Sequence, residues 1–119
     1  MNLIAYLCQL LDCDEFELVT RLRIQSNRVL VEKSLAGKTL YTLYSDKPHE
    51  VVFHGLSIGD SRTTKAYNGY LDITVQQHFY VRHRNKLSYP LLPLVVHIQK
   101  NSSHRSFYPM ELLIITVWI

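Results

Sequence analysis

The residues best suited to bind a charged ligand lie at the end of one short predicted helix. Thr74-Val75-Gln76-Gln77 has the pattern of a capping box, in which a threonine and a glutamine satisfy backbone groups at a helix start. The nine residues from 78 to 86 then contain His78, Arg82, His83, Arg84 and Lys86. An imidazole can donate a hydrogen bond to a phosphate oxygen, and a guanidinium can donate two. The cluster therefore suits a phosphodiester, although a solvated helix end without specific function can have the same composition.

The helical period predicts how these side chains are arranged. Val75 and Phe79 are four positions apart and should form the apolar side of the helix. His78 and Arg82 should lie beside each other on an adjoining stripe, with His83 flanking Phe79 on its other side. The polar cluster is thus expected to border a buried phenylalanine.

The positive charge of the chain is concentrated in the half that contains this cluster. The whole chain has a formal net charge of +3. Residues 1–60 contain 6 Lys and Arg against 8 Asp and Glu, whereas residues 61–119 contain 7 against 2. The net charges are therefore −2 and +5. This asymmetry favours a polyanionic ligand for the second half, although a modest basic excess is also found in domains that bind no nucleic acid.

The sequence offers little for catalysis or for a metal ion. It has no nucleophile-elbow motif and no glycine-rich phosphate loop. Asp72 and Glu111 are the only acids of the second half, whereas a metal-dependent nuclease needs clustered carboxylates. His78 and His83 are five positions apart, and the other histidines are scattered at positions 49, 54, 97 and 104. We therefore expect no enzyme activity, no metal site and no cofactor.

The hydrophobic pattern predicts helices first and strands afterwards. Helices are expected over residues 3–12, from residue 14 onward, and over a third segment that Ser26-Asn27 caps and Gly37 ends. Strand-forming residues then predict strands over residues 39–44, 50–56 (ended by a break at 58–61), 65–71, 94–97, 107–110 and 112–117. Short strands with helices at one end indicate an α+β, mostly β fold, namely a small, partly open barrel of the oligonucleotide-binding (OB) type.

The length of 119 residues suits a single domain. No run of 18 apolar residues occurs, and the first residues lack the pattern of a signal peptide. We therefore expect one domain over residues 1–119 without a membrane partner.

Three blocks in the second half carry a resemblance to a known family. They are residues 73–79, 87–93 and 106–112. In this order and spacing they resemble the PAZ domain of Argonaute proteins, a module that holds the 3′ end of single-stranded guide RNA. Residues 4–12 are similar to the helix that leads into this domain in Argonautes, which favours an Argonaute over a Dicer source. The resemblance implies an OB-like barrel with an inserted helix–hairpin module that forms one wall of a cleft.

The resemblance also implies which residues contact RNA. In the family, two tyrosines and a basic residue on the short helix hold the phosphate between the last two nucleotides, and the matching residues here are His78, Arg82 and His83. Arg82 fits the basic role, whereas the histidines keep a flat ring and a donor but have a shorter reach. Ser106 and Tyr108 match positions that line the terminal nucleotide.

Several family positions are altered. His49 falls near a usual arginine, and Val51 falls near a usual tyrosine, so that a hydroxyl is missing. The segment 58–66 is shorter than in typical Argonautes and lacks the phenylalanine that stacks on the terminal base, for which Tyr67 is the candidate substitute. These departures resemble those of divergent, nematode-type Argonautes.

The resemblance implies a non-catalytic RNA-binding module excised from a larger Argonaute chain, in line with the apolar end at residues 112–119. The expected partners are the 3′ end of a single-stranded small RNA and the other domains of the parent Argonaute. The expected location is the cytoplasm, with the nucleus as the alternative. The competing interpretation is a degenerate PAZ domain that binds RNA weakly and serves as a structural spacer or protein-contact surface.

Overall fold

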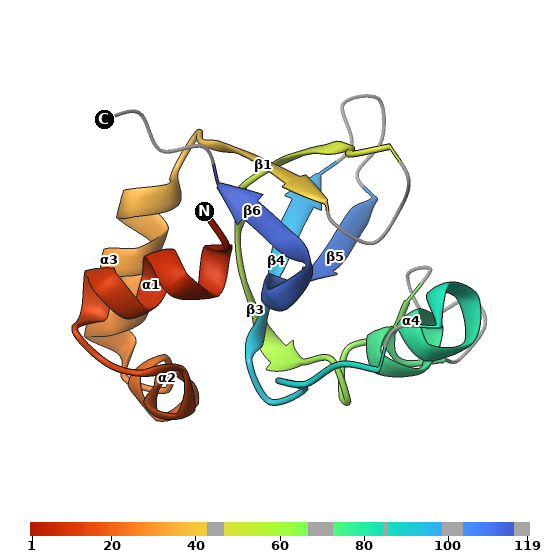
Figure 1. Cartoon of the computed structure of the whole chain (residues 1–119), viewed down its shortest axis with the longest axis horizontal. Coiled ribbons are helices and arrows are strands. Elements are labelled where there is room, and N and C mark those ends of the chain that lie inside the picture. The colour runs from red at the N-terminus through yellow and green to blue at the C-terminus, as the bar shows by residue number, and fades with distance from the viewer. Residues whose placement is uncertain (43–46, 67–72, 85, 99–103, 116–119) are drawn as a thin grey trace.

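A computed structural model of the chain describes residues 1–42, 47–66, 73–84, 86–98 and 104–115. Three helices precede the strands, and a fourth helix is inserted between the third and fourth strands (Figure 1). The helices are α1 (Leu3–Leu11), α2 (Glu15–Arg21), α3 (Gln25–Leu35) and α4 (Val75–His83). The strands are β1 (Thr39–Thr42), β2 (Glu50–Val52), β3 (Gly55–Asp60), β4 (Pro93–Ile98), β5 (Arg105–Pro109) and β6 (Leu113–Ile115).

The strands form two antiparallel sheets, ordered β2-β1-β6 and β3-β4-β5. Thr39 of β1 lies opposite Val52 of β2, so that two of the predicted strands pair as an antiparallel hairpin. In the other sheet, His97 of β4 lies opposite Ser106 of β5. The two sheets are separate ladders, so the barrel is not closed. The predicted α+β fold, a small and partly open barrel with N-terminal helices, is thereby confirmed.

The helical layer and the barrel share the main hydrophobic core. The layer formed by α1, α2 and α3 covers one side of the barrel, and α4 lies at the other side (Figure 1). Leu7 of α1, Leu18 of α2 and Leu35 of α3 are all 0% exposed and join Leu40 and Val95 of the barrel in one cluster. No described helix is both long enough and apolar enough to cross a bilayer.

A second, smaller core holds α4 against the β3-β4-β5 sheet. Its buried residues are Ala66, Val75, Phe79, Leu87 and Leu94. Leu94 belongs to β4, whereas the other four come from the insertion between β3 and β4. The inserted helix is therefore attached to the barrel through a separate apolar contact.

Three predicted boundaries in the first half are wrong. The third helix begins at Gln25, so Ser26 and Asn27 lie inside it, and its N-cap residue Ile24 makes no side-chain cap. The strand predicted over residues 50–56 is two strands, β2 and β3, because the chain passes here from one sheet to the other. Gly55, the first residue of β3, has a φ of 148° that residues other than glycine rarely adopt. The second of these strands, β3, continues through the break predicted at residues 58–61 as far as Asp60.

Later in the chain, one predicted strand region is partly a turn, and another predicted strand lies mostly outside the described residues. Residues Met110–Leu112 form a short 3-10 helix where a strand was predicted, and this turn carries the chain from β5 in one sheet to β6 in the other. The strand predicted over residues 65–71 extends mostly outside the described residues. Of its described part, Lys65 makes an isolated bridge with Thr74.

Candidate nucleic-acid interface

Helix α4 is fixed at both ends by local contacts. At its start, the Thr74 hydroxyl accepts a hydrogen bond from Gln77 N–H, and the Gln77 side chain accepts one from Thr74 N–H, which confirms the predicted capping box. At its end, Arg84 adopts a left-handed conformation with a φ of 55°. Val75 and Phe79 are both 2% exposed, as the apolar stripe predicted. The opposite face of α4 is consequently presented away from the core.

Three rings gather on the last two turns of α4. The ring centroids of His78 and His83 are 5.3 Å apart in an edge-to-face arrangement. Phe79 lies 5.2 Å from His78 and 5.3 Å from His83. The prediction that His83 would lie on the far side of Phe79 from His78 is therefore wrong: His83 is the last residue of the helix, and its ring contacts both others. The two imidazoles form one site.

The environment of His78 favours the neutral form of its imidazole. Burial lowers the pKa of His78 below its ordinary value, and the nearby His83 and Arg82 lower it further. A neutral imidazole has one donor and one acceptor nitrogen. An anion bound beside the three groups would offset their mutual repulsion and favour protonation of the ring.

This lowered pKa should make the stability of the protein depend on pH. Because the folded pKa of His78 lies below the unfolded value of about 6.5, the unfolded chain takes up the proton first. The free energy of unfolding should therefore fall as the pH drops through about 6.5 toward the lower, folded pKa. Urea unfolding of the wild type and of His78→Gln, measured from about pH 7.5 to about pH 5.5, should give a shallower dependence in the variant. Equal slopes would contradict the assignment.

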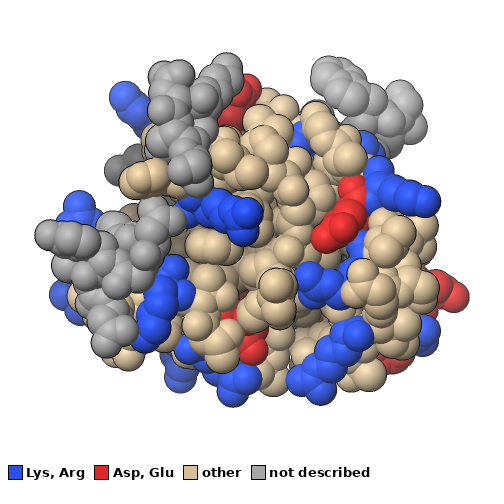
Figure 2. All heavy atoms as spheres, turned by 180° about the vertical axis from the view of Figure 1, so that it is seen from behind, with Lys and Arg blue, Asp and Glu red and all other residues tan. Residues whose placement is uncertain are grey.

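Exposed cations surround the ring cluster. Arg82, Arg84 and Lys86 are all exposed, and in the described part of the chain no carboxylate forms an ion pair with Arg82. Seen from behind, basic side chains predominate over acidic ones across the lower and left margins of the molecule (Figure 2). The described end of α4 thus combines two imidazoles with uncompensated positive charge, which is suited to an anion.

The residues predicted on β5 lie on one face of the sheet. Because neighbouring strand residues alternate between faces and His97 pairs with Ser106, the side chains of Ser106, Tyr108 and His97 share a face. Phe107 lies on the opposite face and packs against the core below α4. Tyr108 is half-buried against the main core, and this burial raises the pKa of its phenol despite a hydrogen bond with Ser106.

His97 belongs to this face, although nothing in the sequence singled it out. Its Nδ1 lies 3.2 Å from both the backbone N and the backbone O of Val52 in β2. Its ring is 6.5 Å from the ring of Tyr108 and 5.5 Å from that of His54. His97 therefore joins the two sheets and turns its other nitrogen away from β2. Finding it required the strand register, which the sequence does not reveal.

The remaining predicted positions are on or near β2. His49 precedes this strand, is exposed, and donates its backbone N–H to the Thr42 hydroxyl at 3.0 Å. Val51 is 0% exposed and points into the main core. Tyr67 lies outside the described residues. The predicted residues that the structure describes therefore fall into two groups, one on α4 and one on β5 and on or beside β2.

A carboxylate anchors the chain segment that returns from α4 to the barrel. Glu111 accepts backbone N–H bonds from Ser88 at 2.9 Å and from Tyr89 at 3.0 Å, one on each oxygen. The Tyr89 hydroxyl bonds Glu15 of the helical layer, and this bond is the largest of the causes that raise the pKa of Tyr89. The sequence did not reveal this role of Glu111, because nothing in it shows which backbone groups need a partner.

No group of three or more His, Cys, Asp or Glu side chains is arranged to hold a metal ion among the described residues. The described residues instead bring together hydrogen-bond donors on α4, which suit an anionic or polar ligand.

Two open antiparallel sheets, with a helix inserted between two neighbouring strands of one of them, define a class of small barrel domains related to the OB fold. Within this class the chain has the fold of a PAZ domain. It is similar to the PAZ domain of a Drosophila Argonaute solved in complex with 3′-end 2′-O-methylated RNA, with 20% identity, coverage of 98% of each chain and a TM-score of 0.78.

Two solved structures of the Drosophila Argonaute 2 PAZ domain are also similar. One, which describes 3′-end recognition of nucleic acids, shares 20% identity over 98% of this chain and 94% of its own, with a TM-score of 0.70. The other shares 19% identity over 98% and 99%, with a TM-score of 0.71. No protein-family model matches the chain. The resemblance inferred from three sequence blocks is thus confirmed at the level of the fold.

Proposed function

We propose that this chain is a non-catalytic module that binds the 3′ end of single-stranded guide RNA. The observation that carries the proposal is the cluster, at the end of α4, of two imidazoles and a guanidinium that pairs with no described carboxylate. The proposal is also supported by similarity in fold to a Drosophila PAZ domain that was solved in complex with 3′-end 2′-O-methylated RNA. Phosphate contacts combined with ring stacking suit single strands of any sequence.

In this proposal the last phosphodiester binds at α4. Arg82 donates two hydrogen bonds to the phosphate, and His78 and His83 donate one each. The contact of the two rings at 5.3 Å lets both approach the same phosphate group. Protonation of His78 on binding then adds a charge where the negative ligand offsets the repulsion from Arg82 and His83.

The terminal nucleotide lies against β4 and β5. Ser106 and Tyr108 line it, as the family resemblance implies, and His97 joins them because it shares their face of the sheet. We assign His49 a contact with the RNA backbone and Tyr67 stacking on the terminal base. The parent protein is an Argonaute whose other domains contact this module, and its location is the cytoplasm.

The competing function is a structural spacer with weak RNA binding. The burial of Val51 favours it, since a residue that is 0% exposed in the core contacts no ligand and leaves one family position unfilled. The two functions differ in whether the end of an RNA strand matters for binding.

A titration with end-modified RNA tests the proposal. Fluorescence anisotropy would compare a short single-stranded RNA with a free 3′ hydroxyl, the same strand with a 3′ phosphate, and its circular form. The terminal clamp predicts that the free-ended strand binds at least about tenfold more tightly, a difference of about 1.4 kcal/mol. Equal affinity for the three forms would overturn the clamp, and weak binding of all three would favour the spacer.

A further inference from the structure

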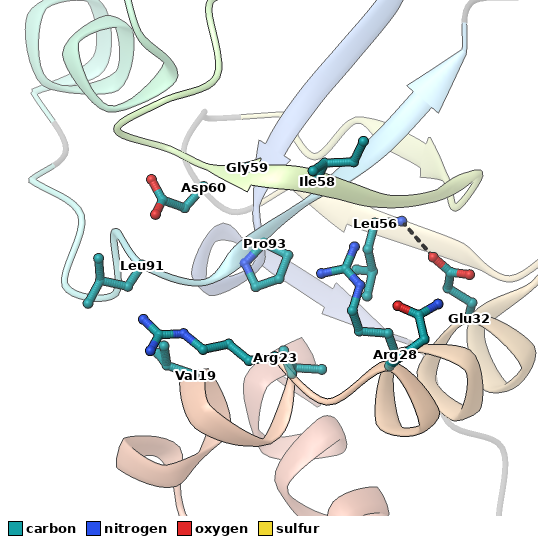
Figure 3. A pocket seen from close by; sticks show the side chains of 12 residues that line it. Val19, Arg23, Arg28, Glu32, Leu56, Ile58, Gly59, Asp60, Leu91 and Pro93 are labelled. Carbon is teal, nitrogen blue, oxygen red and sulfur yellow. Dashed lines mark hydrogen bonds between the residues drawn. The ribbon is translucent and has the colours of Figure 1, made fainter.

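A groove separates the helical layer from the strands that lead to α4 (Figure 3). It has a volume of about 570 Å³, within the range of sites that hold a ligand. On one side it is lined by α2, α3 and the turn between them, and on the other by β3 and by the segment that enters β4. The second side consists of both chain segments that connect the inserted module to the barrel.

Two arginines enter the groove from the helical side (Figure 3). Arg23 is exposed in the turn between α2 and α3, and its side chain runs toward Leu91. Arg28 of α3 donates a hydrogen bond to the backbone O of Ser57 at 2.8 Å. Among the described residues, neither guanidinium has a carboxylate within ion-pairing distance.

The two acids that line the groove are already engaged. Asp60 accepts hydrogen bonds from the Arg62 backbone and guanidinium; burial opposes its ionisation, but these bonds outweigh it and lower the pKa of the carboxyl. Glu32 accepts a hydrogen bond from the backbone N–H of Leu56 in β3, with an N–O distance of 3.4 Å. Because Arg62 neutralises Asp60, and because Arg23 and Arg28 outnumber Glu32, the groove retains a small excess of positive charge.

The apolar part of the lining is aliphatic. Leu91 is 40% exposed, and Leu56 and Pro93 form the floor beside it (Figure 3). None of the described residues that line the groove is aromatic, so the groove offers no stacking surface for a base. Aliphatic side chains beside arginines that form no ion pair with a described carboxylate are instead suited to a polypeptide with matching side chains.

We propose that this groove binds an extended polypeptide segment that carries alternating acidic and aliphatic side chains. Its carboxylates pair with Arg23 and Arg28, and its aliphatic side chains cover Leu91 and Pro93. Such a segment contacts the helical layer and both connections to α4 at once, so that it fixes the inserted module relative to the helices. The groove lies apart from the ring cluster on α4, and the proposal does not depend on RNA binding.

A pair of synthetic peptides tests the charge and the place of this contact. The first is a capped hexapeptide, Glu-Leu-Glu-Leu-Glu-Leu, and in the second lysine replaces every glutamate. In heteronuclear NMR titrations of the whole chain, the acidic peptide should shift the amides of Arg23, Gly59 and Leu91. Its affinity should exceed that of the lysine peptide at least about tenfold, or about 1.4 kcal/mol, and should weaken with added salt.

A charge reversal supplies the matched comparison. Arg23→Glu should weaken binding of the acidic peptide at least about fivefold and strengthen binding of the lysine peptide, whereas Arg21→Glu, at the end of α2 and outside the groove, should do neither. Equal effects of the two variants, or equal binding of both peptides, would overturn the proposal. Shifts of the same amides by single-stranded RNA but by neither peptide would also overturn it and would assign the groove to nucleic acid.

Discussion

Replacing Phe79 by alanine should lower the free energy of unfolding by about 3–5 kcal/mol, as is usual for a buried phenylalanine. Phe79 is 2% exposed and packs on Val75, Leu87 and Leu94. It and Val75 are the two buried residues of α4. A helix of nine residues is too short to be stable in water by itself, so this contact must hold it in place.

Urea unfolding measures the expected loss, and hydrogen exchange shows where it occurs. Amides of α4 should exchange faster in Phe79→Ala, because the helix opens locally before the barrel unfolds. Tyr80→Ala is the matched control, since Tyr80 is the next residue and is 58% exposed; it should change stability by no more than about 0.5 kcal/mol. Unchanged exchange in α4 of the Phe79 variant would mean that other contacts hold the helix.

Local signals allowed much of this fold to be predicted from the sequence. The start of α4 was predictable because a capping box depends on residues three positions apart, and its buried face followed from the spacing of Val75 and Phe79. The hairpin of β1 and β2 was predictable because its two strands are close in sequence. The order of helices and strands, together with three sequence blocks, was sufficient to predict the class of fold.

Long-range geometry was not predictable in the same way. The contact of His78 with His83 depends on how the last helical turn ends at Arg84. The place of His97 beside Ser106 depends on the β4–β5 register. Likewise, the sequence shows Glu111 only as a polar residue in an apolar stretch. In the structure it accepts hydrogen bonds from two backbone N–H groups that are 22 and 23 positions away in the chain. Each of these features joins residues that no local pattern connects.

Replacing Arg82 by alanine should weaken RNA binding by about 1.5 kcal/mol, or roughly tenfold. This is the low end of the range for a hydrogen bond to a charged group, because the guanidinium is exposed. The plot of binding constant against salt should also become less steep by about 0.7, which corresponds to one phosphate of a single strand. Anisotropy titrations of a short RNA at several salt concentrations measure both effects. The fold should be retained, since Arg82 contributes nothing to the buried side of α4.

The dependence on the RNA end separates a terminal clamp from a general basic surface. Arg82→Ala should reduce the affinity for a strand with a free 3′ hydroxyl more than for a strand with a 3′ phosphate, because the phosphorylated end does not reach the clamp in either protein. Arg21→Ala removes the same charge from the helical layer, where Arg21 pairs with Glu17 at 3.5 Å, and should leave the preference for free ends unchanged. Equal losses of affinity for free and blocked ends would show that Arg82 attracts RNA only through its charge. The terminal-clamp role assigned to α4 would then be wrong, and the spacer interpretation would be favoured.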